Sequence, residues 1–391
     1  MRPFLVRLPP GILIPSLLFA LAFVAEPIRG SLAEENPVSK TVLVMHGGAG
    51  VLTEQEMSDW GITSDDFEQA LAKALRAGHQ VLQQGRTCVD AVETAIRSLE
   101  DAGLFNAGRG AAFNADGRVE LDAAIMEGRM EGAGEGKGDP RKRAGAVTGV
   151  AHIKNPISAA RAVMETPDSP HVLLAGEGAE WFALGEANRQ RYGIVKVSNV
   201  YFWTDRRLKQ IRNELEQEAA SDAHGALAPG VGRPDRPRAE GRFSTVGAVA
   251  LDAHQGLAAG TSSGGLTRKA PGRIGGSPVI GAGTYADDRA CGVSCTGTGE
   301  VFIRHAVAHD VVARMLYGER SVADAARETI DALPDEEGGV GGLIALDRNG
   351  RHTFAMSPKS VGMYRGFVTQ QGEVYVAIFA DQPAKRVNSS P

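Results

Sequence analysis

The sequence predicts an α/β protein made of layered β-sheets with helices on the outside. Short β-branched and apolar runs recur along the chain, helical segments come in contiguous pairs, and the two kinds do not alternate regularly. Regular βαβ alternation would instead indicate a parallel Rossmann-type sheet. The chain has 391 residues, 43% of them apolar and 23% charged, so it can bury the core of one large domain or of two ordinary ones.

The segment 1–33 has the composition of a signal peptide. Two early arginines precede an apolar stretch at 11–25, and Ser31 and Ala33 offer the small side chains of a cleavage site. A membrane anchor is the alternative, but a spanning helix needs roughly 20 apolar residues. We therefore expect residues 1–33 to be removed and the mature chain to be exported, periplasmic or secreted, with no membrane segment.

The mature chain is expected to begin with a strand at 41–50, which ends in a glycine turn. Apolar residues at helical spacing then predict a helix over 67–85. Thr87 is placed to cap a second helix over 88–103. A glycine- and asparagine-rich loop follows at 105–117.

The middle of the chain changes in composition. Before the change, 144–153 and 171–176 have strand character and 157–165 has helical spacing. From about 204 to 244, a charged helical piece runs into a Gly/Pro/Arg-rich stretch that has almost nothing to bury. This composition predicts a flexible linker.

The C-terminal part is a succession of short strands with one capped helix at 321–333. The predicted strands lie at 245–252, 256–263, 293–297, 341–347, 352–356 and 373–379.

Several classes of function are excluded by charge and motif. The 42 basic and 47 acidic residues give a net charge of −5, so nucleic acid is not an expected partner. HGGAG lacks the spacing and the lysine of nucleotide-binding loops. Cys88, Cys291 and Cys295 are an odd set without a CxxC pair, so no disulfide framework or cysteine metal site is indicated. A single Cys291–Cys295 bridge stays open.

Thr245 stands at the junction between the predicted linker and a predicted strand. A threonine hydroxyl is a weak nucleophile and needs a base within hydrogen-bond reach. If the chain is cut before Thr245, the new α-amine, with an unperturbed pKa of about 7.7–8.0, supplies that base. The alternative is a long surface loop that enters a strand whose first residue happens to be threonine.

Stretches along the mature chain resemble the plant-type asparaginase and isoaspartyl peptidase family of N-terminal-nucleophile hydrolases. They are, in order, HGGAG, LFNAGRGAAFN, ELDAAIMEG, TVGAVALD, TSSGG, GRIGGSP, GAGTYAD and SCTGTGEVFIR. The resemblance implies an αββα sandwich made as one precursor that cuts itself between Ser244 and Thr245. The products would be an α subunit of 34–244 and a β subunit of 245–391, which pair into an (αβ)2 assembly.

The same resemblance implies the chemistry and the site. The family hydrolyses β-aspartyl dipeptides and the side-chain amide of L-asparagine, with no cofactor for catalysis. The implied catalytic residues are Thr245 as nucleophile, Ser263 beside it, Thr296 and Gly297 as oxyanion hole, and Asn106 near the processing site. The implied substrate-binding residues are Arg273, Gly276, Thr296, Gly297, Thr298 and Gly299, with Arg273 holding the α-carboxylate. A structural sodium ion would be bound by backbone carbonyls of Leu99, Glu100, Ala102, Phe105, Ala107 and Arg109.

Three departures from the family pattern affect these expectations. Gly276 replaces the aspartate that would bind the substrate α-ammonium, so we expect L-asparagine to be a poor substrate and a β-aspartyl compound without a free α-amine to be a better one. The alternative is that Asp287 or Asp288 supplies the charge. Ser244 replaces the usual Gly or Asp before the nucleophile, which predicts slow self-cleavage. The loop at 129–143 is longer than in the family and could gate the site.

Two rival functions share the same features. A glycosylasparaginase would use the same nucleophile on sugar-bearing asparagine, although HGGAG and TSSGG favour the plant-type group. A non-catalytic exported binding protein of the same fold would agree with Gly276, although the nucleophile and oxyanion positions are intact.

Overall fold

The computed structural model describes residues 41–130, 142–167, 169–223, 245–334 and 341–388. The predicted signal peptide, most of the loop at 129–143, and residues 224–244, which include Ser244, lie outside these described residues. No helix in the described part of the chain is long and apolar enough to cross a membrane.

Nine strands form the larger sheet, in the order β13-β12-β11-β1-β5-β6-β2-β3-β4. All neighbours are antiparallel except β3 and β4. In sequence order, the strands are β1 (Thr41–Gly48), β2 (Leu121–Met130), β3 (Lys142–Val150), β4 (Leu173–Ala175), β5 (Val246–Leu251), β6 (Leu257–Ser263), β11 (Gly362–Thr369), β12 (Val374–Phe379) and β13 (Lys385–Arg386).

Four antiparallel strands form the smaller sheet, in the order β10-β9-β8-β7. They are β7 (Thr284–Ala286), β8 (Cys291–Gly297), β9 (Gly341–Asp347) and β10 (His352–Met356). Cys291 and Cys295 lie four positions apart in β8, roughly 13 Å at the usual rise per residue. A disulfide needs Cα atoms within about 7 Å, and both thiols are indeed free and buried, as is Cys88. The Cys291–Cys295 bridge is therefore excluded.

Ten helices and one 3₁₀ turn complete the described chain. They are α1 (Glu54–Asp59), α2 (Ser64–Gln83), α3 (Cys88–Asp101), α4 (Pro156–Glu165), α5 (Gly176–Leu184), α6 (Glu186–Tyr192), the 3₁₀ turn Asn199–Phe202, α7 (Asp205–Ala223), α8 (Gly299–His305), α9 (Val307–Gly318) and α10 (Val322–Asp331). Thr87 caps α3 as the sequence predicted, with its side chain accepting from the Asp90 N–H at 3.2 Å.

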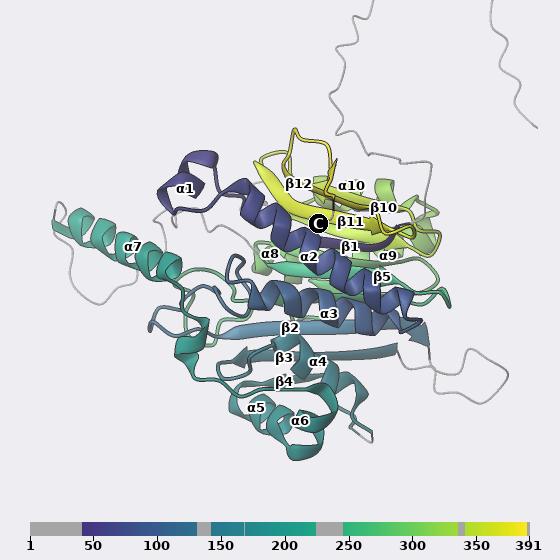
Figure 1. The fold of residues 1–391 in the computed structure, drawn as a ribbon, viewed down its shortest axis with the longest axis horizontal. Helices are drawn as coiled ribbons and strands as arrows, with labels where there is room; N and C mark the ends of the chain where they lie inside the picture. Colours follow the sequence, from purple (N-terminus) through teal and green to yellow (C-terminus); the bar gives the residue numbers. More distant parts are fainter. Residues whose placement is uncertain (1–40, 131–141, 168, 224–244, 335–340, 389–391) are drawn as a thin grey trace, which may run out of the picture. The chain divides into compact units, whose positions relative to one another are not determined.

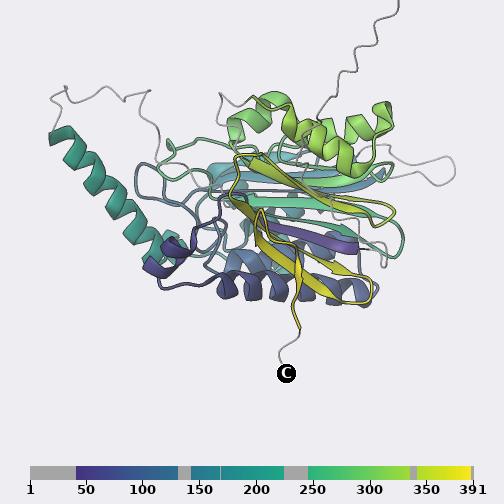
Figure 2. The ribbon, with the colours of Figure 1, turned by 90° about the horizontal axis from the view of Figure 1, so that it is seen from above.

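The elements stack as helices, sheet, sheet, helices (Figures 1 and 2). Successive side chains of a strand point to opposite faces of the sheet, so one sheet contributes to two cores. In β1, Leu43 and Met45 pack into a core shared with α2 and α3, whereas Val44 between them packs into the core shared with the second sheet. A third core lies between the smaller sheet and α9 and α10. The predicted layered fold is confirmed, and it is consistent with the fold of N-terminal-nucleophile hydrolases.

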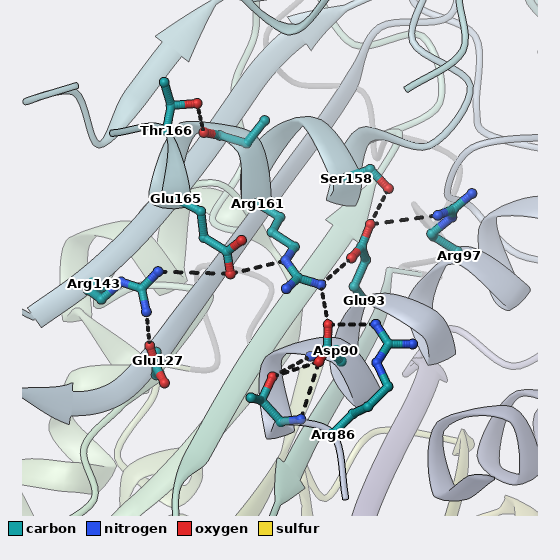
Figure 3. A network of polar contacts seen from close by, with 12 residues as sticks. Arg86, Asp90, Glu93, Arg97, Glu127, Arg143, Ser158, Arg161, Glu165 and Thr166 are labelled. Carbon is teal, nitrogen blue, oxygen red and sulfur yellow. Dashed lines mark hydrogen bonds and ion pairs between the residues drawn. The ribbon is translucent and has the colours of Figure 1, made fainter. Parts of the chain in front are cut away.

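A network of charged side chains joins α3 to α4 on the outer face of the larger sheet (Figure 3). The Arg161 guanidinium donates to Asp90 and Glu93, each at 2.7 Å, and lies 3.1 Å from Glu165. Because Arg161 is largely buried, its charge is matched by these carboxylates rather than by water. The network holds two helices against the sheet that carries Thr245.

The charged half of the predicted linker segment forms α7, which extends away from the sheets (Figures 1 and 2). Two arginines in its first turn hold it to the loop between α3 and β2. Arg206 Nη2 donates to the Leu104 carbonyl at 2.6 Å, and Arg207 Nε donates to the Gly110 carbonyl at 2.7 Å. The first turn of α7 is therefore bound to the same loop that contains Asn106.

Candidate active site

Thr245 lies directly before β5, the strand between β1 and β6 at the centre of the larger sheet. Only 7% of it is exposed. Its hydroxyl oxygen is 3.0 Å from the hydroxyl of Ser263, the last residue of β6. The Gly265 N–H donates to the Ser263 oxygen at 3.0 Å, so that oxygen is already an acceptor and its proton is available to Thr245.

A small pocket lies against Thr245, with a volume of about 10 Å³, about the space of one water molecule. The predicted Gly276, Thr296, Gly297 and Gly299 all line it together with Thr245. The remaining lining residues are Ser277, Gly283, Cys295 and Phe302. Tertiary structure thus brings together residues from the start of β5, the loop before β7, the end of β8 and the start of α8.

Asn106 lies one contact away from the Thr245–Ser263 pair. Its Nδ2 donates to the Gly265 carbonyl at 2.6 Å, and its backbone carbonyl accepts from the Gly264 N–H at 2.9 Å. Its Oδ1 accepts from the Ala112 N–H at 2.7 Å. Asn106 therefore fastens the chain that leaves β6 to the loop between α3 and β2, and fixes the peptide that contacts Ser263.

Arg273 is paired with Glu300 in the described structure. Arg273 Nε and Nη2 donate to the two carboxylate oxygens of Glu300 at 2.9 and 2.8 Å. This pair occupies one edge of the guanidinium and orients it, and the Nη1 side can still receive a second carboxylate. A Cβ built on Gly299, which lines the pocket, would come within 2.9 Å of Arg273 Nη2, so the guanidinium is adjacent to the pocket wall.

The residues that line the pocket include no carboxylate. Asp287 forms a two-point pair with Arg289, at 3.0 and 2.7 Å, and Asp288 accepts from the Leu257 N–H at 2.8 Å. Neither lines the pocket, so the geometry gives no support to Asp287 or Asp288 as a replacement for an aspartate at Gly276. Thr298 is also outside the lining set and is the residue before α8.

The loop predicted to bind sodium is closed by a hydrogen bond from the Arg109 N–H to the Glu100 carbonyl at 2.7 Å. Its backbone carbonyls are hard oxygen donors, the type that alkali and alkaline-earth cations prefer. The Glu100 side chain is buried and accepts from Ser262 Oγ at 2.7 Å. Burial raises the pKa of Glu100 to about 8. The loop is therefore bound through Glu100 to the residue next to Ser263.

His46 is the main contact that sequence reasoning missed. Its Nδ1 donates to the backbone carbonyl of Thr245 at 3.0 Å, and its Nε2 lies 3.0 Å from Ser294 Oγ. Burial lowers the pKa of His46 to about 3, so the ring is neutral at physiological pH. A signal was present in the sequence, because TVLVMHGG places one histidine inside an otherwise apolar strand.

Glu300 was also missed, along with Ser277, Gly283, Cys295 and Phe302 of the pocket wall. All five lie inside stretches that carry the family resemblance, namely GRIGGSP, GAGTYAD and SCTGTGEVFIR. Their presence in those stretches was the available signal. Which of their side chains reach Thr245 or Arg273 depends on the packing of α8 and β8.

Comparison with known proteins shows the family to which this chain belongs. The family model described as asparaginase matches residues 39–378. The isoaspartyl peptidase of Salmonella typhimurium is 42% identical over 331 residues, which cover 84% of this chain and 96% of the relative. The mouse isoaspartyl peptidase/L-asparaginase is 36% identical over 327 residues, covering 84% and 86%. The plant-type L-asparaginase of Thermococcus kodakarensis is 37% identical over 331 residues, covering 81% and 93%. The chain belongs to the asparaginase family.

Proposed function

We propose that this protein hydrolyses β-aspartyl dipeptides and, less efficiently, the side-chain amide of L-asparagine. The names of the relatives, isoaspartyl peptidase and L-asparaginase, support this class of substrate. The observation that carries the proposal is the 3.0 Å contact between the Thr245 and Ser263 hydroxyls beside a pocket that also contains Thr296 and Gly297. A buried pair of hydroxyls next to potential oxyanion donors suits acyl transfer.

The nucleophile is generated by self-cleavage between Ser244 and Thr245. The products are an α subunit of 34–244 and a β subunit of 245–391, joined before cleavage by the segment from about 204 to 244. Cleavage frees the Thr245 α-amine, whose unperturbed pKa of about 7.7–8.0 suits a general base near neutral pH. This amine and the hydroxyl belong to one residue, so the base needs no other side chain to bring it into place.

Thr245 Oγ then attacks the side-chain carbonyl carbon of the β-aspartyl group and passes its proton to the α-amine. The oxyanion that forms accepts hydrogen bonds from the Thr296 hydroxyl and the Gly297 N–H, each of which is worth about 2.7–4 kcal/mol in comparable sites. Collapse breaks the C–N bond, and the leaving amine takes the proton. Water hydrolyses the Thr245 ester, which releases the acid and restores the hydroxyl.

Ser263 and Arg273 complete the site. The Ser263 hydroxyl donates to Thr245 Oγ and orients it, while the Ser263 oxygen accepts from the Gly265 N–H. Arg273 holds the substrate α-carboxylate through its Nη1 side while Glu300 holds the opposite edge. Asn106 keeps the peptide after Ser263 in place. Gly299 forms the wall on the side of α8, and Thr298 is the residue directly before that helix.

The chain acts as an exported protein after removal of residues 1–33, and the cleaved subunits form an (αβ)2 assembly. No cofactor takes part in catalysis. A sodium ion would be held by the backbone carbonyls of Leu99, Glu100, Ala102, Phe105, Ala107 and Arg109, and would stiffen the loop that contains Asn106.

Mass spectrometry of freshly made protein, combined with a panel of β-aspartyl dipeptides and L-asparagine, tests the proposal. We expect two chains that meet at Ser244 and Thr245, and release of the free amino acid from the dipeptides. Thr245→Ala should give one uncut chain with no activity. An uncut, inactive wild-type chain would favour a binding protein of the same fold, and activity only on glycosylated asparagine would favour a glycosylasparaginase.

A further inference from the structure

Four buried side chains form a continuous chain of hydrogen bonds that ends on the backbone of Thr245. His46, Ser294, Thr261 and Thr284 are each 0% exposed. The Thr284 and Thr261 hydroxyls are 2.6 Å apart, and the Thr261 and Ser294 hydroxyls are 2.7 Å apart. Ser294 Oγ is 3.0 Å from His46 Nε2, and His46 Nδ1 is 3.0 Å from the Thr245 carbonyl oxygen.

The protons available to these four side chains allow only one donor-to-acceptor direction along the row of hydrogen bonds. A carbonyl oxygen only accepts, so His46 Nδ1 carries the ring proton and donates it to Thr245. The neutral ring then has Nε2 as an acceptor, and Ser294 must donate to it. Because a hydroxyl has one proton, Ser294 is an acceptor toward Thr261.

The hydroxyl protons of Thr261 and Thr284, at the end away from Thr245, can be assigned in the same way. Thr261 also lies 3.0 Å from the Gly283 carbonyl, but a proton placed there would leave the close contact between the Thr261 and Ser294 hydroxyls without one. Thr261 therefore donates to Ser294 and can only accept from Thr284, whose hydroxyl is closer to Thr261, at 2.6 Å, than to the Ser277 carbonyl, at 3.2 Å. Every donor in the chain points toward Thr245, and the His46 tautomer is determined by its neighbours.

Gly247 provides the room for this chain. A Cβ at Gly247 would overlap both Ser294 Oγ and His46 Nε2. Its φ is outside the left-handed range, so the backbone conformation does not itself require glycine. The glycine leaves space for the hydrogen bond between His46 and Ser294.

The Thr245 carbonyl lies just beyond the regular ladder on both sides of β5. Toward β6, the register begins at Val246 paired with Ser262, and toward β1 it ends at His46 paired with Gly247. The strand pairing therefore stops one residue short of Thr245 toward β6 and two residues short of it toward β1. Beyond that point, the His46 side chain donates to the Thr245 carbonyl.

We propose that His46 is a positioning residue for Thr245, acting through the Thr245 carbonyl. This inference rests on the proposed function, in which Thr245 supplies both the nucleophile and the base. The α-amine, the hydroxyl-bearing side chain and the carbonyl all branch from the Thr245 Cα. Holding the carbonyl from the side opposite to Ser263 therefore fixes the direction of the amine and the hydroxyl toward the substrate.

Two substitutions of similar polarity separate the two nitrogens of His46. An asparagine amide reaches about as far as Nδ1 and can still donate to the Thr245 carbonyl, whereas a glutamine amide reaches about as far as Nε2. The readouts are the fraction of cut chain by mass spectrometry, and kcat and KM per cut site on a β-aspartyl dipeptide. We expect His46→Gln to lower kcat about tenfold or more, with KM changed less than about threefold, since small displacements of reacting groups cost this much. His46→Asn should recover most of the lost kcat.

A control variant measures the effect of removing a buried histidine in general. His352, in β10, packs edge-on against Phe354 and at a tilt against Phe367 and, like His46, has a pKa lowered by burial, to about 4. His352→Gln should keep the wild-type kcat per cut site. Equal losses in His46→Asn and His46→Gln, or a loss in His352→Gln as large as in His46→Gln, would overturn the proposal.

The proposal stays testable if His46→Gln is not cut. Ser294→Ala removes the hydrogen bond that holds His46 Nε2 and leaves the ring itself intact. We expect a kcat about threefold lower with KM unchanged, and an unchanged kcat would contradict the proposal. Wild-type protein that is cut but releases nothing from β-aspartyl dipeptides would instead refute the proposed function. This measurement uses no His46 variant, so the two failures can be told apart.

Discussion

Arg273 and Glu300 form a two-point ion pair beside the pocket that contains Thr245, with contacts of 2.9 and 2.8 Å. The pair is partly exposed, with Arg273 at 15% and Glu300 at 38%. Its contribution to stability is therefore modest, and its main consequence is orientation. An arginine whose Nε edge is already held can present the other edge to a substrate carboxylate with little further loss of side-chain freedom.

This relationship predicts a graded effect on substrate affinity. Arg273→Lys removes the planar fork, so KM for a β-aspartyl dipeptide should rise about tenfold or more. Glu300→Gln keeps the size of the side chain but loses its charge, and KM should rise only about two- to fivefold. Steady-state kinetics of both variants provide the measurement. Unchanged KM in Arg273→Lys would show that the α-carboxylate binds elsewhere.

Ser263 should act through its hydroxyl alone. Ser263→Ala removes the donor that faces Thr245, and kcat per cut site should fall by about one to two powers of ten. Ser263→Thr keeps the hydroxyl and should retain a kcat within about threefold of wild type. Rates are compared after the cut fraction is measured by mass spectrometry. Equal kcat in the Ala and Thr variants would remove Ser263 from the mechanism.

Gly276 should determine how well a free α-ammonium is tolerated. Its backbone does not require glycine, and a Cβ would contact Phe302 Cβ at 3.2 Å, a distance that a shift of a few tenths of an ångström relieves. Gly276→Asp should raise kcat/KM for L-asparagine about tenfold to a hundredfold, the worth of one charge-assisted hydrogen bond.

The neutral variant Gly276→Asn is the matched control for size and should give no such gain. The wild-type protein should prefer an N-acylated β-aspartyl substrate to the free-amine form. An efficient wild-type L-asparaginase that Gly276→Asp hardly improves would contradict this account of the site.

Ser244 should slow maturation. Self-cleavage passes through a strained peptide, and glycine reaches strained backbone conformations at the least energetic cost. Ser244→Gly should therefore be cut faster than wild type in a time course followed on a denaturing gel. Wild-type protein that is fully cut when first isolated would disprove slow processing.

Acidification should lower the free energy of unfolding, because His46 is buried in the neutral form. Its native pKa of about 3 lies below the unfolded value of about 6.5. Between these values the unfolded chain binds a proton that the native chain does not, so the free energy of unfolding rises with pH and falls on acidification. Between pH 7.5 and 5.0, this one group should account for a loss of about 2 kcal/mol.

The measurement is urea unfolding of wild type and His46→Asn at both pH values. The variant lacks the titrating ring, so the loss of stability on acidification should be smaller in the variant than in wild type by the contribution of that ring. Other groups that titrate cancel in this difference. Parallel losses in the two proteins would show that His46 is protonated in the native state.

Much of the fold could be predicted from local pattern. The alternation and length of apolar runs indicated the central strands, and helical spacing with Thr87 as cap indicated α2 and α3. The charged helical piece after residue 204 is α7. The order of strands in the sheets could not be predicted this way, because β1 lies between β5 and β11, which are both far from it along the chain.

The candidate site divides in the same way. The position of Thr245 between a linker and a strand made a threonine nucleophile one of two interpretations. The resemblance to the asparaginase family then implied the role of Ser263 and the oxyanion hole of Thr296 and Gly297. The acids considered for the α-ammonium, Asp287 and Asp288, are both nearby in sequence, yet their side chains bind elsewhere.

The sequence by itself determined which groups are available for chemistry and that a threonine opens a strand behind a segment unlike its surroundings. Tertiary structure alone decided what holds that threonine. His46 is 199 residues from Thr245 along the chain, and Ser294 is 248 residues from His46. They meet because β1 and β5 are paired in one register and because Gly247 leaves space between the sheets. Strand pairing and packing, not local sequence, set such contacts, since a shift of one residue would turn His46 to the opposite face of the sheet.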